Sequence, residues 1–303
     1  MDIRQSQQYA NHMRSLGWKV ERVGKWNAFI KSFPFIGSFI KIQRIDNPIP
    51  WKEIEELQKK HRAFRMVIEP DLNTKLEIRN LKLEILNSPF SPTKTIHIDL
   101  APTEETIFKR FKESTRRAVR RAQKNKVTIE QSNNIEEFIR LKTRSMFPVG
   151  YFMGRDIRKL WNAFRPKNAK VLFAYKTVVM VSNRNEKMSQ SMKSLYFNSH
   201  YDDTYHRSGL LGGILLLFHE QTAYYWHAAA TPEGKKLFAP TLLVWEALKL
   251  SKKRGCKTFN FEGIYDERFP DSFKKWRGFT KFKKGFGGTE IEYPEPFAIM
   301  SRS

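Results

Sequence analysis

Cysteine is nearly absent from this chain of 303 residues, since Cys256 is the only one. A single thiol excludes a framework of internal disulfides and suits a reducing compartment. Long apolar runs are also missing: the longest, residues 210–218, is far shorter than the roughly 20 residues that a membrane-spanning helix needs. The first thirty residues contain no apolar core of the kind found in signal peptides. We therefore expect a soluble, cytoplasmic protein that meets a membrane, if at all, peripherally at its inner face.

Acidic residues are scarce relative to basic ones, with 31 Asp and Glu against 55 Lys and Arg, which gives a net charge of +24. An enzyme that acts on a small neutral substrate does not need this excess. RNA, a pyrophosphate-bearing ligand or an anionic membrane surface would each be attracted by it. A basic proteome or selection for solubility would produce the same total. The charge therefore restricts the partners without choosing among them.

The basic residues are densest between residues 109 and 126, where Glu113 is the only acid. Pro102 precedes a predicted helix here, whose apolar stripe is Ile107, Phe111, Ala118 and Ala122. On its exposed face the bases recur at every fourth position, and like charges at that spacing repel each other. The pattern favours a phosphate-binding face, for tRNA or for a pyrophosphate, over a merely solvated one. The candidate phosphate contacts are Arg116, Arg117, Arg120, Arg121 and Lys124.

Strand and helix patterns alternate in both halves of the chain. In the second half, strands at residues 210–218 and 222–229 precede a helix that begins at Pro240 and ends at Gly255, and a strand at 258–262 follows. This order describes the centre of an N-acetyltransferase domain. We therefore predict an α/β (α+β) fold of two tandem acetyltransferase-like (GNAT) subdomains with mixed sheets, residues 1–145 and 146–289. The tail 290–303 is expected to pack on the first subdomain, and the polar stretch 183–207 to be an insertion.

The segment 276–288 reads Trp-Arg-Gly-Phe-Thr-Lys-Phe-Lys-Lys-Gly-Phe-Gly-Gly. It resembles the signature of the Fem-type (FemAB) peptidyltransferases, the aminoacyltransferases that build peptidoglycan cross-bridges. Other segments resemble the same family in order and spacing: 114–122, 224–229, 239–247 and 259–264. The resemblance runs from near residue 5 to near residue 293. Each motif is short, so their joint order carries the resemblance.

The resemblance implies that the chain moves an amino acid from aminoacyl-tRNA to a stem-peptide amine of a peptidoglycan precursor, with neither metal nor cofactor. The acceptor would be lipid II or a soluble nucleotide-linked precursor, held between the two subdomains. Lys283 is the implied catalytic residue, whose charge would stabilise the oxyanion that forms on the ester carbonyl. The implied precursor contacts are Phe282, Tyr224, Tyr225, Arg144 and Arg155. Since neighbouring residues of a strand face opposite sides, one of the two tyrosines is expected in the core.

Three features depart from the family pattern. Asn260 stands where the family has an aspartate, the polar stretch 183–207 is an insertion, and the charged coiled-coil arm of some members is missing. The last feature leaves open whether glycine or another small amino acid is transferred. The three glycines of 285–288 are predicted to form a tight turn rather than a phosphate loop, because no helix start follows them. The histidines and Cys256 do not make a metal-ligand set.

Two other functions stay open. One is a CoA-dependent N-acyltransferase of the same fold. Residues 231–238 weigh against it, because a single Gly234 stands where a Gly-rich pyrophosphate loop would be expected. The other is a non-catalytic basic protein that binds RNA or a membrane surface. It would explain the charge but leave segment 276–288 without a purpose.

Overall fold

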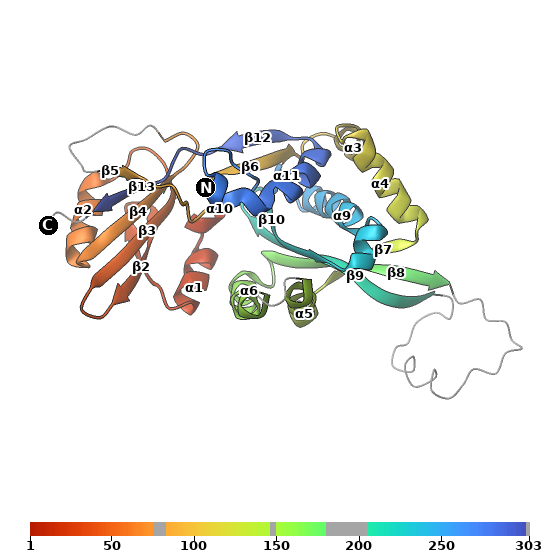
Figure 1. Cartoon of the computed structure of the whole chain (residues 1–303), viewed down its shortest axis with the longest axis horizontal. Helices are drawn as coiled ribbons and strands as arrows, with labels where there is room; N and C mark the ends of the chain where they lie inside the picture. Colours follow the sequence, from red (N-terminus) through yellow and green to blue (C-terminus); the bar gives the residue numbers. More distant parts are fainter. Residues whose placement is uncertain (75–82, 146–149, 180–204, 301–303) are drawn as a thin grey trace, which may run out of the picture.

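The computed structural model describes residues 1–74, 83–145, 150–179 and 205–300. It consists of two mixed sheets, with the N-terminal segment lying between the two units that they form (Figure 1). The first unit contains a short 3-10 helix η1 (Ile3–Gln5), α1 (Gln7–Ser15), β1 (Lys19–Val23), β2 (Trp26–Phe33), β3 (Gly37–Ile45), α2 (Trp51–Lys60), β4 (Ala63–Pro70) and β5 (Leu83–Ile85). Alternate residues of β2, β3 and β4 pack against α2, as the period of two in these strands requires.

The second unit begins with β6 (Lys94–Asp99), α3 (Glu104–Lys109), α4 (Glu113–Lys124), β7 (Val127–Ser132), α5 (Ile135–Ser145) and α6 (Gly150–Phe164). Its central strands and helices are β8 (Ala169–Val179), β9 (Tyr205–His219), β10 (Thr222–Ala230), α8 (Pro232–Lys236), α9 (Ala239–Lys253) and β11 (Thr258–Asn260). The chain ends with α10 (Pro270–Phe273), η2 (Lys274–Trp276), α11 (Arg277–Lys283), η3 (Lys284–Phe286), β12 (Thr289–Glu292) and β13 (Phe297–Met300).

The two sheets repeat one plan. The first has the order β1-β2-β3-β4-β13-β5, and the second runs β12-β6-β11-β10-β9-β8-β7. In the first sheet the antiparallel strands β1, β2 and β3 lead to the parallel pair β3 and β4, and in the second β7, β8, β9 and β10 lead to the parallel pair β10 and β11. The connection within each parallel pair passes through a helix, α2 or α9. An antiparallel neighbour, β13 or β6, follows the pair. The predicted class of two GNAT-like units with mixed sheets is confirmed.

The expected division at residue 145 does not follow these sheets. Strands β6 and β7 and helices α3, α4 and α5 precede that residue but belong to the second unit. In the tail, β13 pairs with β4 and β5 of the first sheet, whereas β12 pairs with β6 of the second. Pairing between strands so distant in the chain leaves no local pattern, which is why the sequence placed the boundary too late. The predicted insertion 183–207 lies outside the described residues, except where 205–207 begin β9.

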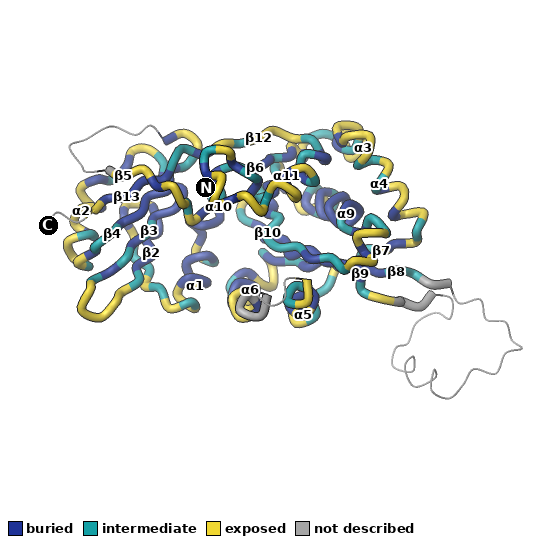
Figure 2. The backbone as a smooth tube through the Cα atoms, viewed as in Figure 1, coloured by how far each residue is buried: buried dark blue, intermediate teal, exposed yellow. Residues whose placement is uncertain are grey.

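Helices cover both faces of the second sheet, above and below it in Figure 1. Leu216 packs with α4 and α9 on one face, while Leu215 packs with α5, α6 and α1 on the other. Figure 2 shows the buried strands between these helix layers. Within the described ranges, no helix is both long and apolar enough to cross a bilayer.

Candidate active site

Lys283 is the last residue of α11, and only 7% of it is exposed. Its Nζ donates to the backbone carbonyls of Phe261 at 2.8 Å and Gly263 at 2.6 Å. It also lies 5.6 Å from the centre of the Tyr225 ring. Burial lowers the pKa of Lys283 to about 8, an effect that the Glu262 carboxylate partly offsets. An ammonium has three donors, so one remains for a substrate. Lys283 is therefore not the solvated lysine that its basic neighbours would suggest.

The loop that holds Lys283 is tight. Glu262 has a φ of 57°, in the left-handed region that residues with a side chain rarely adopt. Its backbone N–H donates to Asn260 Oδ1 at 2.7 Å, and Thr95 Oγ1 donates to the same oxygen at 2.7 Å. A Cβ added to Gly263 would lie 1.9 Å from the Trp276 ring, so only glycine fits there. The uncharged amide of Asn260 thus supplies the acceptor that this loop requires.

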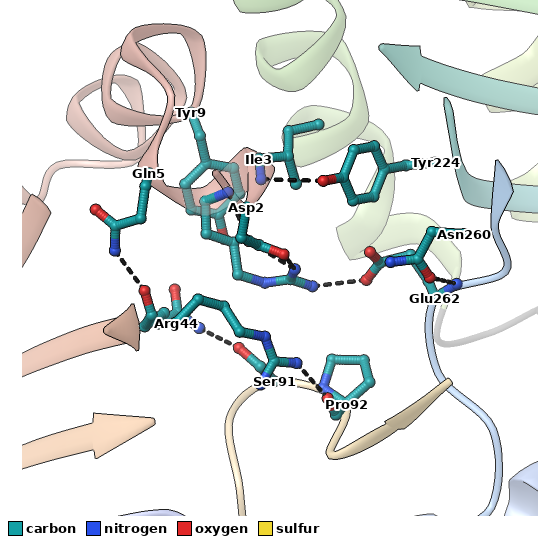
Figure 3. Close-up of polar contacts among 12 residues, drawn as sticks. Asp2, Ile3, Gln5, Tyr9, Arg44, Ser91, Pro92, Tyr224, Asn260 and Glu262 are labelled. Atoms are coloured by element: carbon teal, nitrogen blue, oxygen red, sulfur yellow. Dashed lines mark hydrogen bonds and ion pairs between the residues drawn. The ribbon is translucent and has the colours of Figure 1, made fainter. Parts of the chain in front are cut away.

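The N-terminal segment reaches this loop from the other unit (Figure 3). Arg4 donates to Glu262 at 2.6 Å and forms an ion pair with Asp2 at 3.2 Å, and the Ile3 N–H donates to the Tyr224 hydroxyl at 3.3 Å. Burial opposes the charge of Arg4, yet the two carboxylates raise its pKa well above the ordinary value. Arg4 therefore positions the loop that positions Lys283. Sequence reasoning missed this pair, because its members are 258 residues apart.

A pocket of about 360 Å³ lies between α11 and the start of α4, and its lining includes Phe282 but not Lys283 itself. Phe282 and Gly285 line it from α11 and the turn that follows, and Lys112 and Thr115 line it from the start of α4. Lys281 adds a second cation, and the N-terminus of α4 has no side-chain cap, which leaves its backbone N–H groups available to an anion. All the lining residues belong to the second unit. This pocket therefore does not lie between the two units.

The basic segment forms two helices rather than one. Phe111 is buried between α3 and α4, and the Lys112 N–H donates to the Gly285 carbonyl at 2.9 Å, so the chain turns at 110–112. Arg116 donates to the carbonyls of Lys109, at 2.9 Å, and Phe111. Arg116 therefore caps α3. The prediction that it shares the exposed face with the other bases is wrong. Arg117 pairs with Glu113, whereas the exposed cations that continue along α4 are Arg120, Arg121 and Lys124.

Tyr224 and Tyr225 face opposite sides of the second sheet, as predicted. Tyr224 packs with α1, α5 and α6, and its hydroxyl accepts the hydrogen bond from Ile3. It is the core tyrosine of the pair. Tyr225 packs toward Phe259 and Phe261 and lies beside Lys283. Burial raises the pKa of Tyr225, so its phenol stays protonated and can act as a donor.

Arg144 and Arg155 lie in a different pocket, of about 780 Å³, between α5 and α6. Arg140 and Arg158 share it, and Arg158 is paired with Glu136 at 2.6 Å. Since α5 and α6 cover the face of the sheet opposite to α9, the structure does not bring this arginine pocket to Lys283 (Figure 1).

Lys41 is a cation that sequence reasoning missed. Its Nζ lies 4.9 Å from the Trp18 ring centre and 6.0 Å from that of Phe90. Burial lowers its pKa to about 8. Among the described residues, no carboxylate or carbonyl forms a hydrogen bond or ion pair with it. The available signal was a lysine between two apolar residues of a predicted strand. In the structure Lys41 of β3 lies directly opposite Phe29 of β2.

The glycine-rich end of α11 is a turn, as predicted. Gly287 and Gly288 have φ values of 74° and 89°, and a Cβ on Gly288 would lie 2.5 Å from the His97 carbonyl. The segment expected to hold a CoA pyrophosphate loop is instead helix α8, capped by Thr231. A Cβ on Gly234 would lie 2.0 Å from the Leu211 carbonyl, so this glycine serves close packing. No cluster of His, Cys, Asp or Glu in the described part of the chain could hold a metal ion.

Comparison with known proteins agrees with these observations. The FemAB family model matches residues 155–301, which contain the motifs at 224–229, 239–247, 259–264 and 276–288, and the resemblance is confirmed. Over 99% of this chain, the fold is similar to 92% of the chain in a structure described as a crystal structure of FemX, with a TM-score of 0.73 at 17% identity.

Two further structures have a similar fold. A conserved protein of unknown function from Bacteroides thetaiotaomicron matches with a TM-score of 0.59 at 10% identity, over 98% of this chain and 91% of the other. The C-terminal domain of a putative lysylphosphatidylglycerol synthetase from Agrobacterium fabrum matches with 0.55 at 13% identity, over 99% and 89%. At these identities the likeness concerns the fold alone. No curated protein sequence matches the chain.

Proposed function

We propose that this chain, whose residues 155–301 match the FemAB family, is an aminoacyltransferase that acts on a peptidoglycan precursor. Its donor is aminoacyl-tRNA, and its acceptor is a stem-peptide amine. The observation that carries the proposal is the buried Lys283 ammonium, which two backbone carbonyls hold in place. A pocket with basic walls on the same helix, α11, supports it.

The chemistry asks little of the protein beyond placement and charge. The acceptor amine attacks the ester carbonyl of the donor, the carbon–oxygen ester bond breaks and an amide forms. The ribose oxygen that leaves takes up the proton that the amine gives up. Negative charge collects on the carbonyl oxygen during this step, and the remaining donor of Lys283 would stabilise it. Phe261 and Gly263 fix the ammonium in advance, so little reorganisation is needed.

The 360 Å³ pocket is the proposed site of the aminoacyl end of the donor. Lys112 and Lys281 line it, and the exposed cations Arg120, Arg121 and Lys124 continue from it along α4. These side chains suit the phosphates of an RNA acceptor stem. Phe282 and Tyr225 would shape the wall near the reacting atoms, since both lie next to Lys283.

The acceptor carries phosphates as well as its peptide. Lys41 is the proposed contact to these anionic groups. A half-buried cation without a carboxylate partner is expected to bind an anion, because burying an uncompensated charge is costly.

The direct test is to incubate the protein with a mixture of charged tRNAs and lipid II, or its nucleotide-linked precursor, and to weigh the product. We expect the acceptor to gain the mass of one amino acid residue. A parallel reaction with acetyl-CoA tests the second acyl donor. Acetylation of the acceptor without aminoacyl transfer would overturn the proposal.

The transfer rate should depend on pH through Lys283. Because burial lowers its pKa to about 8, the ammonium is fully charged near pH 6 and is lost as pH rises through about 8. The single-turnover rate, corrected for spontaneous ester hydrolysis, should therefore fall above pH 8. Since Glu262 raises this pKa, Glu262→Gln should move the falling limb to lower pH. A rate that keeps rising through pH 9.5 in both proteins would show that the ammonium form is not required.

Charge removal on α4 should weaken tRNA binding and its salt dependence. Each phosphate contact contributes roughly 0.7–0.9 to the slope of log affinity against log salt. The triple variant Arg120→Gln/Arg121→Gln/Lys124→Gln should therefore lower that slope by about 2, measured by filter binding over a salt series. A matched triple at exposed bases of α2, Lys52→Gln/Lys59→Gln/Lys60→Gln, should leave it unchanged. Equal slopes for the wild type and the α4 variant would show that these cations are merely solvated and do not contact tRNA phosphates.

A further inference from the structure

The turn between β2 and β3 presents large apolar side chains to water. Phe33, Phe35 and Ile36 are 42%, 110% and 69% exposed. The turn has a defined conformation, because the Ile36 N–H donates to the Pro34 carbonyl at 2.8 Å and the Phe33 ring packs at 6.1 Å from Phe64. A contiguous apolar projection of this kind marks an interaction site rather than a scattered surface residue. We call residues 33–36 the apolar tip.

Cations lie next to the apolar tip. Arg62 is exposed, and its carbonyl accepts from the Ser38 N–H at 3.3 Å, directly behind the turn. Lys31 precedes the tip on β2, and its Nζ donates to the Gly17 carbonyl at 3.0 Å, which ties the hairpin to the end of α1. Apolar residues at the tip and bases behind it are the arrangement expected of a segment that enters a lipid interface.

The same surface continues to the arginine pocket. Lys159 of α6 donates to the Ser15 carbonyl at the end of α1, and Arg155 and Arg158 lie within one turn of it. The tip, the end of α1, α6 and α5 follow one another along the lower edge of the molecule in Figure 1, and much of the tip and of α1's end is exposed in Figure 2. Asp156 adds one exposed carboxylate to this edge, and Glu136 is neutralised by Arg158.

We propose that this edge docks on an anionic lipid bilayer, with the apolar tip inserted among the acyl chains and the arginine pocket against lipid phosphates. Charge complementarity and the apolar tip together select this partner. A nucleic acid would use the same cations but would leave Pro34 and Ile36 against charged phosphates. Docking itself does not depend on the proposed function. Its consequence does: docking would bring the active site to a lipid-linked acceptor rather than a soluble one.

Vesicle binding tests the proposal without any substrate. The wild type should co-sediment with vesicles rich in phosphatidylglycerol and much less with pure phosphatidylcholine. The variant Phe35→Ser/Ile36→Ser should bind the anionic vesicles about 10- to 100-fold more weakly, the loss expected when two large apolar side chains no longer enter hydrocarbon. The matched control is Leu72→Ser/Ile85→Ser, whose side chains are 40% and 61% exposed. They lie toward the other end of the first sheet, since Leu72 follows β4 and Ile85 pairs with Phe297.

A fluorescent label reports insertion directly. Because Cys256 is the only cysteine, is buried and has a pKa raised by burial, a cysteine introduced at the surface can be labelled selectively. An environment-sensitive dye on Phe35→Cys should shift to shorter wavelength when anionic vesicles are added, and the same dye on Leu72→Cys should not.

Three results of the vesicle-binding assay would overturn the inference: absence of wild-type binding to anionic vesicles, equal binding by the tip variant, or an equal loss in the control. None of them bears on aminoacyl transfer. The tip variant should transfer to a soluble nucleotide-linked acceptor at the wild-type rate while losing at least 10-fold on lipid II in vesicles. Loss on both acceptors by a tip variant that still melts at the wild-type temperature would also reject the docking role.

Discussion

Replacement of Lys283 by alanine should lower the single-turnover transfer rate by about 100- to 1,000-fold, the usual effect of removing one oxyanion donor. Donor and precursor binding should change far less, because the lysine acts on charge that exists only during the reaction. Among the residues that the structure describes, no carboxylate is bonded to the ammonium, which the carbonyls of Phe261 and Gly263 hold, so its charge is available to a substrate.

A second substitution separates chemistry from packing. Lys283→Met keeps the apolar stem of the side chain and should be as inactive as Lys283→Ala. Both variants leave the two buried carbonyls without a donor, so they differ only in packing. The neighbouring Lys284 is paired with Glu290 at 2.7 Å, and Lys284→Met should retain most of the activity. Rates are measured by rapid quench with preformed aminoacyl-tRNA, and binding by filter retention. Normal turnover by Lys283→Met would remove this residue from the mechanism.

Arg4→Met should destabilise the protein by about 3–5 kcal/mol, because it leaves two largely buried carboxylates, Asp2 and Glu262, without their cation. The free energy of unfolding in urea measures this loss. The transfer rate should fall as well, since the strained backbone at Glu262 supports both carbonyls that hold Lys283. The arginine thus couples the folding of the two units to the geometry of the site.

A double-mutant cycle tests that coupling. Arg4→Met/Glu262→Gln removes the charges together and should be less destabilised than the sum of the two single variants. An exposed pair provides the comparison: Arg117→Met breaks the contact to Glu113 and should cost less than about 1 kcal/mol. If the two single losses at Arg4 and Glu262 simply add, the ion pair does not organise the loop.

Most residues of the candidate site were predicted from the family resemblance. The segment around Lys283 marked the lysine, and the alternation rule predicted that Tyr224 and Tyr225 face opposite sides of their sheet, without saying which of them is in the core. The glycines at 287 and 288 were also placed in a turn, because nothing after them could start a helix. The opposite faces of the two tyrosines and the turn are confirmed, because each depends on a few neighbouring residues, while the catalytic role of Lys283 stays a prediction.

The basic segment shows where local reasoning stops. Its charges are evident in the sequence, but the break between α3 and α4 depends on Phe111 entering the core and on Lys112 bonding to Gly285, far along the chain. Arg116 followed the expected spacing and nevertheless turned inward to cap α3. A helical pattern predicts which residues share a face, whereas a tertiary contact decides where the helix is interrupted.

The amino-acid sequence alone determined the alternation of strands and helices, the excess of positive charge and the motif that singles out Lys283. These are properties of composition or of short stretches of chain. Only the folded arrangement placed β6 in the second sheet, buried the Lys283 ammonium and set Arg4 against Glu262. Those features join residues up to 258 positions apart. Their energies come from desolvation and from contacts that exist only once both units have formed.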